Sequence, residues 1–210
     1  MYKLYILDFD GTVADTNRII TDTMQATLRE AGLPARSHEA CSQTIGLPLA
    51  EGFRMLMPLT ETQVQACVDI YRRRFAASQK PGVAPLFPGA AEAMRRWHEG
   101  GARVSLASSR GHESLMAFVR EMQLGRYVSL VLGCEDVARP KPDPCPVLQT
   151  LAHFGLDATD ALVIGDMHYD ILMGRGAGCR TCGVTYGNGT EAELRAAGAD
   201  IITDSLLSID

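Results

Sequence analysis

Continuous apolar runs alternate with amphipathic stretches along most of this chain, and that alternation limits its possible folds more than any other feature. Strands are expected in the apolar runs Leu4–Leu7, Ala102–Ala107, Val128–Leu132, Ala161–Ile164, Thr181–Thr185 and Asp200–Ile202. Helices are expected between them, over Pro88–Glu99, Glu113–Gln123, Asp143–Phe154 and Tyr169–Ala177. Strands that are apolar throughout and separated by helices are typical of a parallel sheet with both faces covered. We therefore predict an α/β fold built on a doubly wound, Rossmann-like parallel sheet.

One segment, residues 15–81, departs from this alternation because it contains only helical patterns. Its clearest helix is Thr60–Ala77, which Thr60 and Gln63 could open with a capping box. The apolar residues of this helix recur on one face at helical spacing: Val64, Cys67, Val68, Tyr71 and Phe75. The proline-rich stretch "SQKPGVAPLFPGA" would lead the chain back. We predict a core of residues 1–14 and 82–210, with an all-helical module of residues 15–81 inserted into it.

Composition and charge exclude several classes of function. Hydrophobic residues make up 46% of the 210, and the net charge of -5 gives nucleic-acid binding no electrostatic support. No apolar stretch reaches the ~20 residues that cross a bilayer, and the first strand begins too early for a signal peptide, so a cytoplasmic location is expected. Among the six cysteines only Cys179 and Cys182 form a CxxC pair. A lone pair is weak evidence for zinc, so reduced thiols are expected.

Polar side chains follow four of the expected strands. They are Asp8 and Asp10 after the first strand, Ser108 after the second, Lys141 in "EDVARPKPDP" after the third, and Asp166 and Asp170 after the fourth. Taken alone, "DFDG" could be a strand that ends in a polar turn, since Asp-Gly is a common turn pair. Because ligand sites in open parallel sheets form beyond the carboxyl ends of the strands, four such groups together indicate one site.

These residue types fit phosphoryl transfer. Several carboxylates suit Mg²⁺, which often bridges to a phosphate, and a carboxylate can also be the nucleophile that forms an aspartyl phosphate. Asp8, Asp166 and a phosphate dianion would repel one another by about 4 kcal/mol per pair at ~4 Å and an effective dielectric of about 20. The metal and Lys141 would offset that repulsion. Ser108 could hold a phosphoryl oxygen, and Gly11 would let the backbone turn closely around the transferred group.

The same residues carry a resemblance to a known family. "DFDGT", the strand-end Ser108, "RPKPDP" and "GDMHYD" occur in the order of the four motifs of the haloacid dehalogenase-like (HAD) phosphohydrolase superfamily, which they resemble. The helical module straight after the first motif is similar to that superfamily's first-type cap. The resemblance runs from Tyr5 to the "GADIITDSL" tail, and "GLPL" and "FPGA" look like those of phosphoglycolate phosphatase-type members.

The resemblance implies roles for the four aspartates. Asp8 would attack phosphorus and bind Mg²⁺. Asp10 would protonate the leaving group, then activate water, and would bind the metal through its backbone carbonyl. Asp166 would be the remaining protein ligand of the metal, and Asp170 would support that shell directly or through water.

The resemblance also implies the phosphate contacts. Ser108 would bind the phosphate, and Lys141 would tie the phosphate to the nucleophile. Ser109 and Gly11 are further phosphate-binding candidates, although Ser109 could instead be a helix cap or a loop hydroxyl. Two departures from the family pattern occur: Ser109 stands where many such phosphatases have Asn, and Met167-His168 replaces a small polar pair.

The resulting hypothesis is a Mg²⁺-dependent phosphatase that hydrolyses a small phosphorylated metabolite through a phosphoaspartyl intermediate on Asp8. A sugar phosphomutase of the β-phosphoglucomutase type would use the same catalytic residues, so it stays open. A phosphoacceptor signalling domain would also use an Asp, a hydroxyl, a Lys and Mg²⁺, although it would need neither the helical module nor Asp10. Arg110, beside the strand-end serine, could either grip a substrate anion or lie on the surface.

Overall fold

The computed structural model describes residues 1–80 and 82–210, and within them it contains one parallel sheet. Its strands are β1 (Leu4–Leu7), β2 (Arg103–Ala107), β3 (Val128–Leu132), β4 (Ala161–Gly165), β5 (Arg180–Val184) and β6 (Ile201–Thr203). They lie in the order β3-β2-β1-β4-β5-β6, and every neighbouring pair is parallel. This is the strand order of a doubly wound α/β fold, so the predicted fold class is confirmed.

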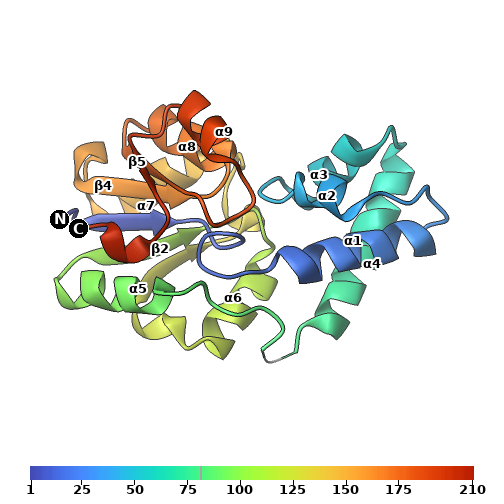
Figure 1. Cartoon of the computed structure of the whole chain (residues 1–210), viewed down its shortest axis with the longest axis horizontal. Helices are drawn as coiled ribbons and strands as arrows, with labels where there is room; N and C mark the ends of the chain where they lie inside the picture. Colours follow the sequence, from blue (N-terminus) through green and yellow to red (C-terminus); the bar gives the residue numbers. More distant parts are fainter. Residues whose placement is uncertain (81) are drawn as a thin grey trace.

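Helices cover both faces of the sheet (Figure 1). They are α5 (Ala90–Glu99), α6 (His112–Glu121), α7 (Cys145–Phe154), α8 (His168–Gly176) and α9 (Glu191–Ala196). Successive side chains of β1 point to opposite faces: Tyr5 and Leu7 pack with α5 and α6, whereas Leu4 and Ile6 pack with α7 and α8. On the first face the ring of Trp97 stacks on Tyr5, with 4.1 Å between the centroids. The strand that ends in Asp8 is therefore buried from both sides.

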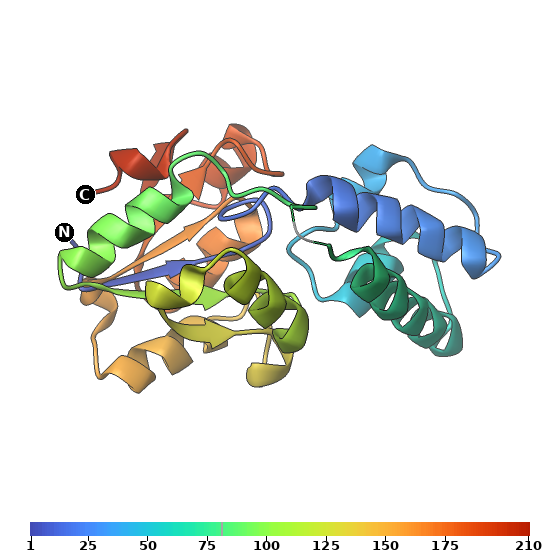
Figure 2. The ribbon, with the colours of Figure 1, turned by 90° about the horizontal axis from the view of Figure 1, so that it is seen from below.

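Four helices follow β1 directly and stand together at one end of the sheet (Figure 2). They are α1 (Asn17–Glu30), α2 (His38–Ser42), α3 (Leu49–Leu56) and α4 (Glu61–Ser78), and with their loops they are called the cap below. The capping box predicted at the start of α4 is present: Gln63 N donates to Thr60 Oγ1 at 3.3 Å, and Thr60 N donates to Gln63 Oε1 at 2.9 Å. The apolar face predicted for this helix is the buried one. The domain boundaries at residues 14/15 and 81/82 stay a prediction, and Pro81 lies outside the described residues.

The remaining differences from the predicted elements lie mainly at their ends. Helix α5 begins at Ala90 because Gly89 adopts the left-handed region, with φ of 80°. Helix α9 was not predicted, since its six residues are too few for a clear period. Short 3₁₀ turns occur at Leu124–Arg126, Cys134–Asp136, Ala158–Asp160 and Leu206–Ser208. No helix in the described ranges has both the length and the apolar character needed to cross a membrane.

The chain reverses its direction of travel across the sheet between β1 and β4, which are neighbours. The two strands stay joined past their ends, because Asp8 N donates to the Ile164 carbonyl at 2.9 Å. In open α/β sheets a crevice forms at such a reversal, outside the carboxyl ends of the strands. The loops that carry the predicted site residues meet there.

Candidate active site

Asp8 and Asp10 lie in a tight turn at the end of β1. The Phe9 carbonyl accepts from Val13 N and Ala14 N, both at 3.0 Å, so the chain folds back immediately after the strand. Asp8 is 2% exposed and Asp10 is 7% exposed. A carboxylate buried to this degree is costly unless a cation or several donors stand beside it.

Lys141 supplies that cation for Asp8. Its Nζ donates to Asp8 Oδ1 at 2.5 Å and to Asp170 Oδ1 at 2.6 Å, and the lysine itself is buried. Burial alone would lower the pKa of Lys141, but Asp170 and Asp8 raise it above its ordinary value, so the ammonium form is held. The other oxygen of Asp170 accepts from Met167 N at 3.1 Å. Asp170 therefore orients Lys141 against Asp8.

The two carboxylates that contact this lysine form, together with a third, a group that could hold a metal ion. One oxygen each of Asp8, Asp166 and Asp170 lies within 4.8 Å of the others, and all three residues are buried. Burial raises the pKa of Asp8 well above its usual range, although Lys141 lowers it. Burial, followed by the charge of Asp170, raises the pKa of Asp166 to about 7. The buried carboxylate oxygens outnumber the ammonium groups beside them, and such a set of oxygen ligands suits a hard divalent cation.

Asp166 is fixed by donors from two other loops. Thr12 Oγ1 donates to its Oδ1 at 3.1 Å, while Asn188 donates to its Oδ2 through the backbone N at 2.7 Å and through Nδ2 at 2.9 Å. Gly11 has φ of 95°, and a Cβ there would lie 2.1 Å from Asp166 Oδ2, so only glycine fits. Asn188 is a residue of this site that the sequence motifs did not predict. It follows β5 in "YGNGT". The rule that sites form beyond the carboxyl ends of parallel strands, called the strand-end rule below, could therefore have found it.

Ser108 and Ser109 follow β2 and face different partners. Ser108 is buried, its backbone N donates to the Leu132 carbonyl at 2.9 Å, and its Oγ accepts from Arg110 N at 3.2 Å. The Ser109 hydroxyl donates to the carbonyl of Gly46, in the cap loop between α2 and α3, at 2.7 Å. Ser109 thus links the sheet to the cap, and its role in phosphate binding stays a prediction.

Arg110 is not on the surface, so that alternative was wrong. Its guanidinium forms a buried ion pair with Asp10, with Nη2 at 2.6 Å from Oδ1 and Nε at 3.0 Å from Oδ2. Thr16 Oγ1 also donates to Asp10 Oδ1, at 2.6 Å. The side chain of Asp10 therefore interacts with Arg110 and Thr16 and lies outside the carboxylate group around Lys141.

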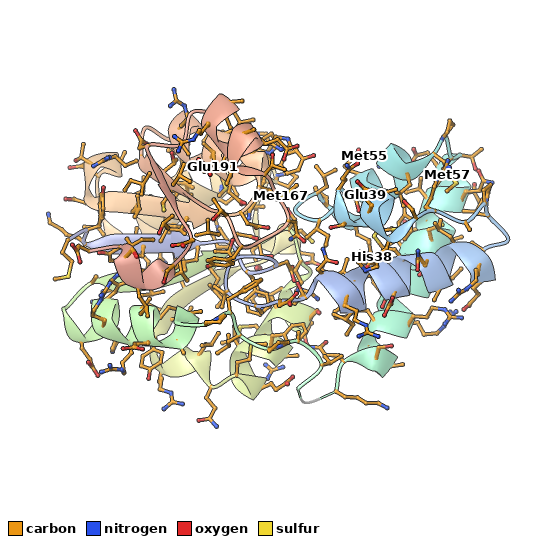
Figure 3. All side chains as sticks on the ribbon, viewed as in Figure 1. His38, Glu39, Met55, Met57, Met167 and Glu191 are labelled. Carbon is orange, nitrogen blue, oxygen red and sulfur yellow. The ribbon has the colours of Figure 1, made fainter. Side chains whose placement is uncertain are left out.

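A cavity of about 790 Å³ opens above these residues. Asp8, Asp10 and Ser108 form part of its wall on the sheet side, and cap residues close the other side. Gly46 in the cap contacts the core, because a Cβ there would lie 3.3 Å from Tyr169 Cδ2 and 3.4 Å from Met167 Cγ. Figure 3 places Met167 on the side of the core that faces the cap. The candidate site is thus a chamber between two layers, with Asp8 and Asp10 on the sheet side.

Comparisons with known proteins match this architecture along nearly the whole chain. A family model described as haloacid dehalogenase-like hydrolase matches residues 5–184. The "Probable phosphatase IndB" of Dickeya dadantii is 34% identical over 214 residues, covering 100% of this chain and 92% of that protein. "Phosphoglycolate phosphatase 1" of Pseudomonas aeruginosa is 25% identical over 215 residues, covering 97% of this chain and 77% of that protein.

A solved structure agrees with these matches. The crystal structure of a haloacid dehalogenase-like hydrolase from Bacteroides fragilis superimposes with a TM-score of 0.92 and 28% identity, covering 98% of each chain. Its agreement extends over the sheet and the cap alike, because almost no residue of either chain is left out. The chain is an enzyme that belongs to the haloacid dehalogenase-like hydrolase family.

Proposed function

We propose that this enzyme is a Mg²⁺-dependent phosphatase that hydrolyses a small phosphorylated metabolite through a phosphoaspartyl intermediate on Asp8. The observation that carries the proposal is the contact of Lys141 with both Asp8 and Asp170 inside a buried carboxylate group. Such a group would bring a nucleophile, a cation and metal-binding oxygens into one small volume. The phosphatase names of two relatives, one of them a phosphoglycolate phosphatase, support the same reaction class.

In the first step a carboxylate oxygen of Asp8 would form a bond to phosphorus while the bond from phosphorus to the leaving oxygen breaks. Asp10 would give its proton to that leaving oxygen. Ser108 and Lys141 would hold the phosphoryl oxygens through their hydroxyl and ammonium groups. A Mg²⁺ held by Asp8 and Asp166, with the backbone carbonyl of Asp10, would supply further neutralisation of the phosphoryl charge.

In the second step a water oxygen would attack phosphorus, and the bond from phosphorus to Asp8 would break. Asp10 would take the proton that the water loses, which makes it ready for the next cycle. The carboxylate of Asp8 is then restored and inorganic phosphate leaves. Throughout, the cap would limit the access of bulk water to the chamber.

The test is release of inorganic phosphate from p-nitrophenyl phosphate with Mg²⁺. Asp8→Asn should abolish turnover, EDTA should abolish it reversibly, and acid-quenched wild type should yield a peptide phosphorylated on Asp8. Asp204→Asn, an exposed aspartate after β6, is the matched control and should retain activity. Full activity in Asp8→Asn, or a stable phosphoprotein without turnover, contradicts the proposal. Phosphate release also separates hydrolysis from phosphomutase chemistry.

A further inference from the structure

Arg110 is a buried cation that has no role in the proposed phosphatase reaction. The guanidinium lies 4.6 Å from the ring centroid of Phe75 in the cap and 5.0 Å from that of Phe118 in α6. Its charge is paired with Asp10, and Nη1 donates to Ser114 Oγ at 3.0 Å. Two aromatic rings and two polar partners fix the position of the side chain. A long side chain held this firmly is prepared for binding, because little conformational freedom remains to be lost.

The guanidinium keeps hydrogen-bonding capacity after these contacts are made. Arginine has five N–H donors in a planar fork. Nε and one N–H of Nη2 serve Asp10, and one N–H of Nη1 serves Ser114. One N–H on each terminal nitrogen therefore has no partner among the described residues. Two donors on adjacent nitrogens match the spacing of carboxylate or phosphoryl oxygens.

Arg110 also stands on the side of the cavity where a leaving group would lie. It lines the cavity and contacts Asp10, the residue that would protonate the leaving oxygen. Many of the cap residues that line the cavity are apolar, among them Ile20, Met24 and Ile45. The second arginine of the lining, Arg72, has a side chain that is 61% exposed and faces Glu135 at 3.8 Å. Among the described residues that line the cavity, Arg110 is thus the buried cation beside Asp10.

We propose that Arg110 is a specificity-determining residue that binds a second anionic group on the substrate. The substrate class is then a phosphate monoester whose leaving alcohol carries a carboxylate or another phosphoryl group. This inference rests on the proposed phosphatase function, because it assigns the leaving-group side of the same cavity. The transferred phosphoryl group itself stays with Ser108 and Lys141.

Matched substrate pairs test the assignment. Wild type is assayed with 2-phosphoglycolate against 2-hydroxyethyl phosphate, and with 3-phosphoglycerate against glycerol 1-phosphate, which differ in a carboxylate. A charge-assisted contact should favour the carboxylated member by about 10- to 100-fold in kcat/KM. Arg110→Gln should remove most of that preference by raising KM for the carboxylated member. Arg195→Gln is the control, because this arginine lies outside the cavity lining, is 64% exposed and pairs with Glu191 in α9; it should keep the wild-type ratio.

Three results would overturn the assignment: no wild-type preference in either pair, a preference that persists in Arg110→Gln, or an equal loss for both members of a pair. Equal loss would mean that Arg110 acts only through Asp10. Circular dichroism checks the fold of each variant. If Arg110→Gln does not fold, Arg110→Met replaces it, and an unchanged preference there also contradicts the assignment. Hydrolysis of p-nitrophenyl phosphate by wild type shows that the phosphatase function stands even when the preference is absent.

Discussion

Replacing Lys141 by methionine should lower the unfolding free energy of the metal-free protein by about 3–5 kcal/mol, the usual cost of removing one partner from a buried ion pair. We expect a loss within this range because Lys141 pairs with two buried carboxylates: its Nζ lies 2.5 Å from Asp8 Oδ1 and 2.6 Å from Asp170 Oδ1. Methionine fills a similar volume, so the loss reports charge rather than a cavity. At about 2–4 °C per kcal/mol for a chain of this size, the melting temperature should fall by about 6–20 °C.

The assay is urea unfolding in EDTA at about pH 7.5, with Lys3→Met as the control. Lys3 pairs with Asp160 at 3.0 Å, but its side chain is 69% exposed, and such surface pairs contribute about 0–1 kcal/mol. The two variants remove the same side chain from a buried and an exposed pair. A loss in Lys141→Met no larger than that in Lys3→Met would refute the argument.

The deficit of Lys141→Met should also shrink as pH falls. Burial already raises the pKa of Asp8 in the folded protein, and Lys141 opposes that rise, so its removal raises this pKa further. A carboxyl group whose folded pKa exceeds its unfolded pKa loses stability as pH rises between the two values, because the folded state then holds more protons. The variant should therefore lie closer to wild type at about pH 5 than at about pH 7.5. A deficit that grows on acidification would contradict this sign.

Two further substitutions test the backbone around the site and the cap. Gly11→Ala should lower the free energy of unfolding by about 1–2 kcal/mol, because residue 11 has a left-handed backbone, and should lower kcat about 100-fold, because the Cβ would displace Asp166. Gly32→Ala is the control: its φ is 67° and nothing lies within 4 Å of the added Cβ, so it should lose stability but not activity. Equal activity in the two variants would contradict the steric argument. Thr60→Ala removes the capping box of α4 and should cost about 1 kcal/mol in urea unfolding, whereas an unchanged midpoint would show that packing alone fixes the start of the helix.

The sheet could be predicted from sequence because its strands are apolar on both faces. Leu4–Leu7 and Val128–Leu132 have the bounds that the sequence predicts. The ends of helices were less predictable. Helix α5, for example, begins after Gly89, because the backbone conformation at the end of a helix depends on what packs against it. The predicted face of α4 matches because packing against α1 and α3 follows the same helical period.

The site was predictable where a residue follows a strand directly, and less so where contacts cross between loops. Asp8, Lys141, Asp166 and Asp170 come together as the strand-end rule requires. The burial of Arg110 depends on Phe75 and Phe118, which come from different helices far apart in the chain. No local pattern around "SSRG" carries that information, because it arises only when the cap packs against the sheet.

The central position of β1 has a consequence for folding. Its residues pair with β2 and β4, with Leu4 opposite Arg103 on one side and Ala161 on the other. Strand β1 therefore has no strand to pair with until residue 103 has been synthesised, whereas helices such as α1 and α2 contact each other over short separations. Long-range pairing of this kind slows folding. The acidic turn after β1 would consequently acquire its partners late, only after Arg110 and Lys141 have been synthesised.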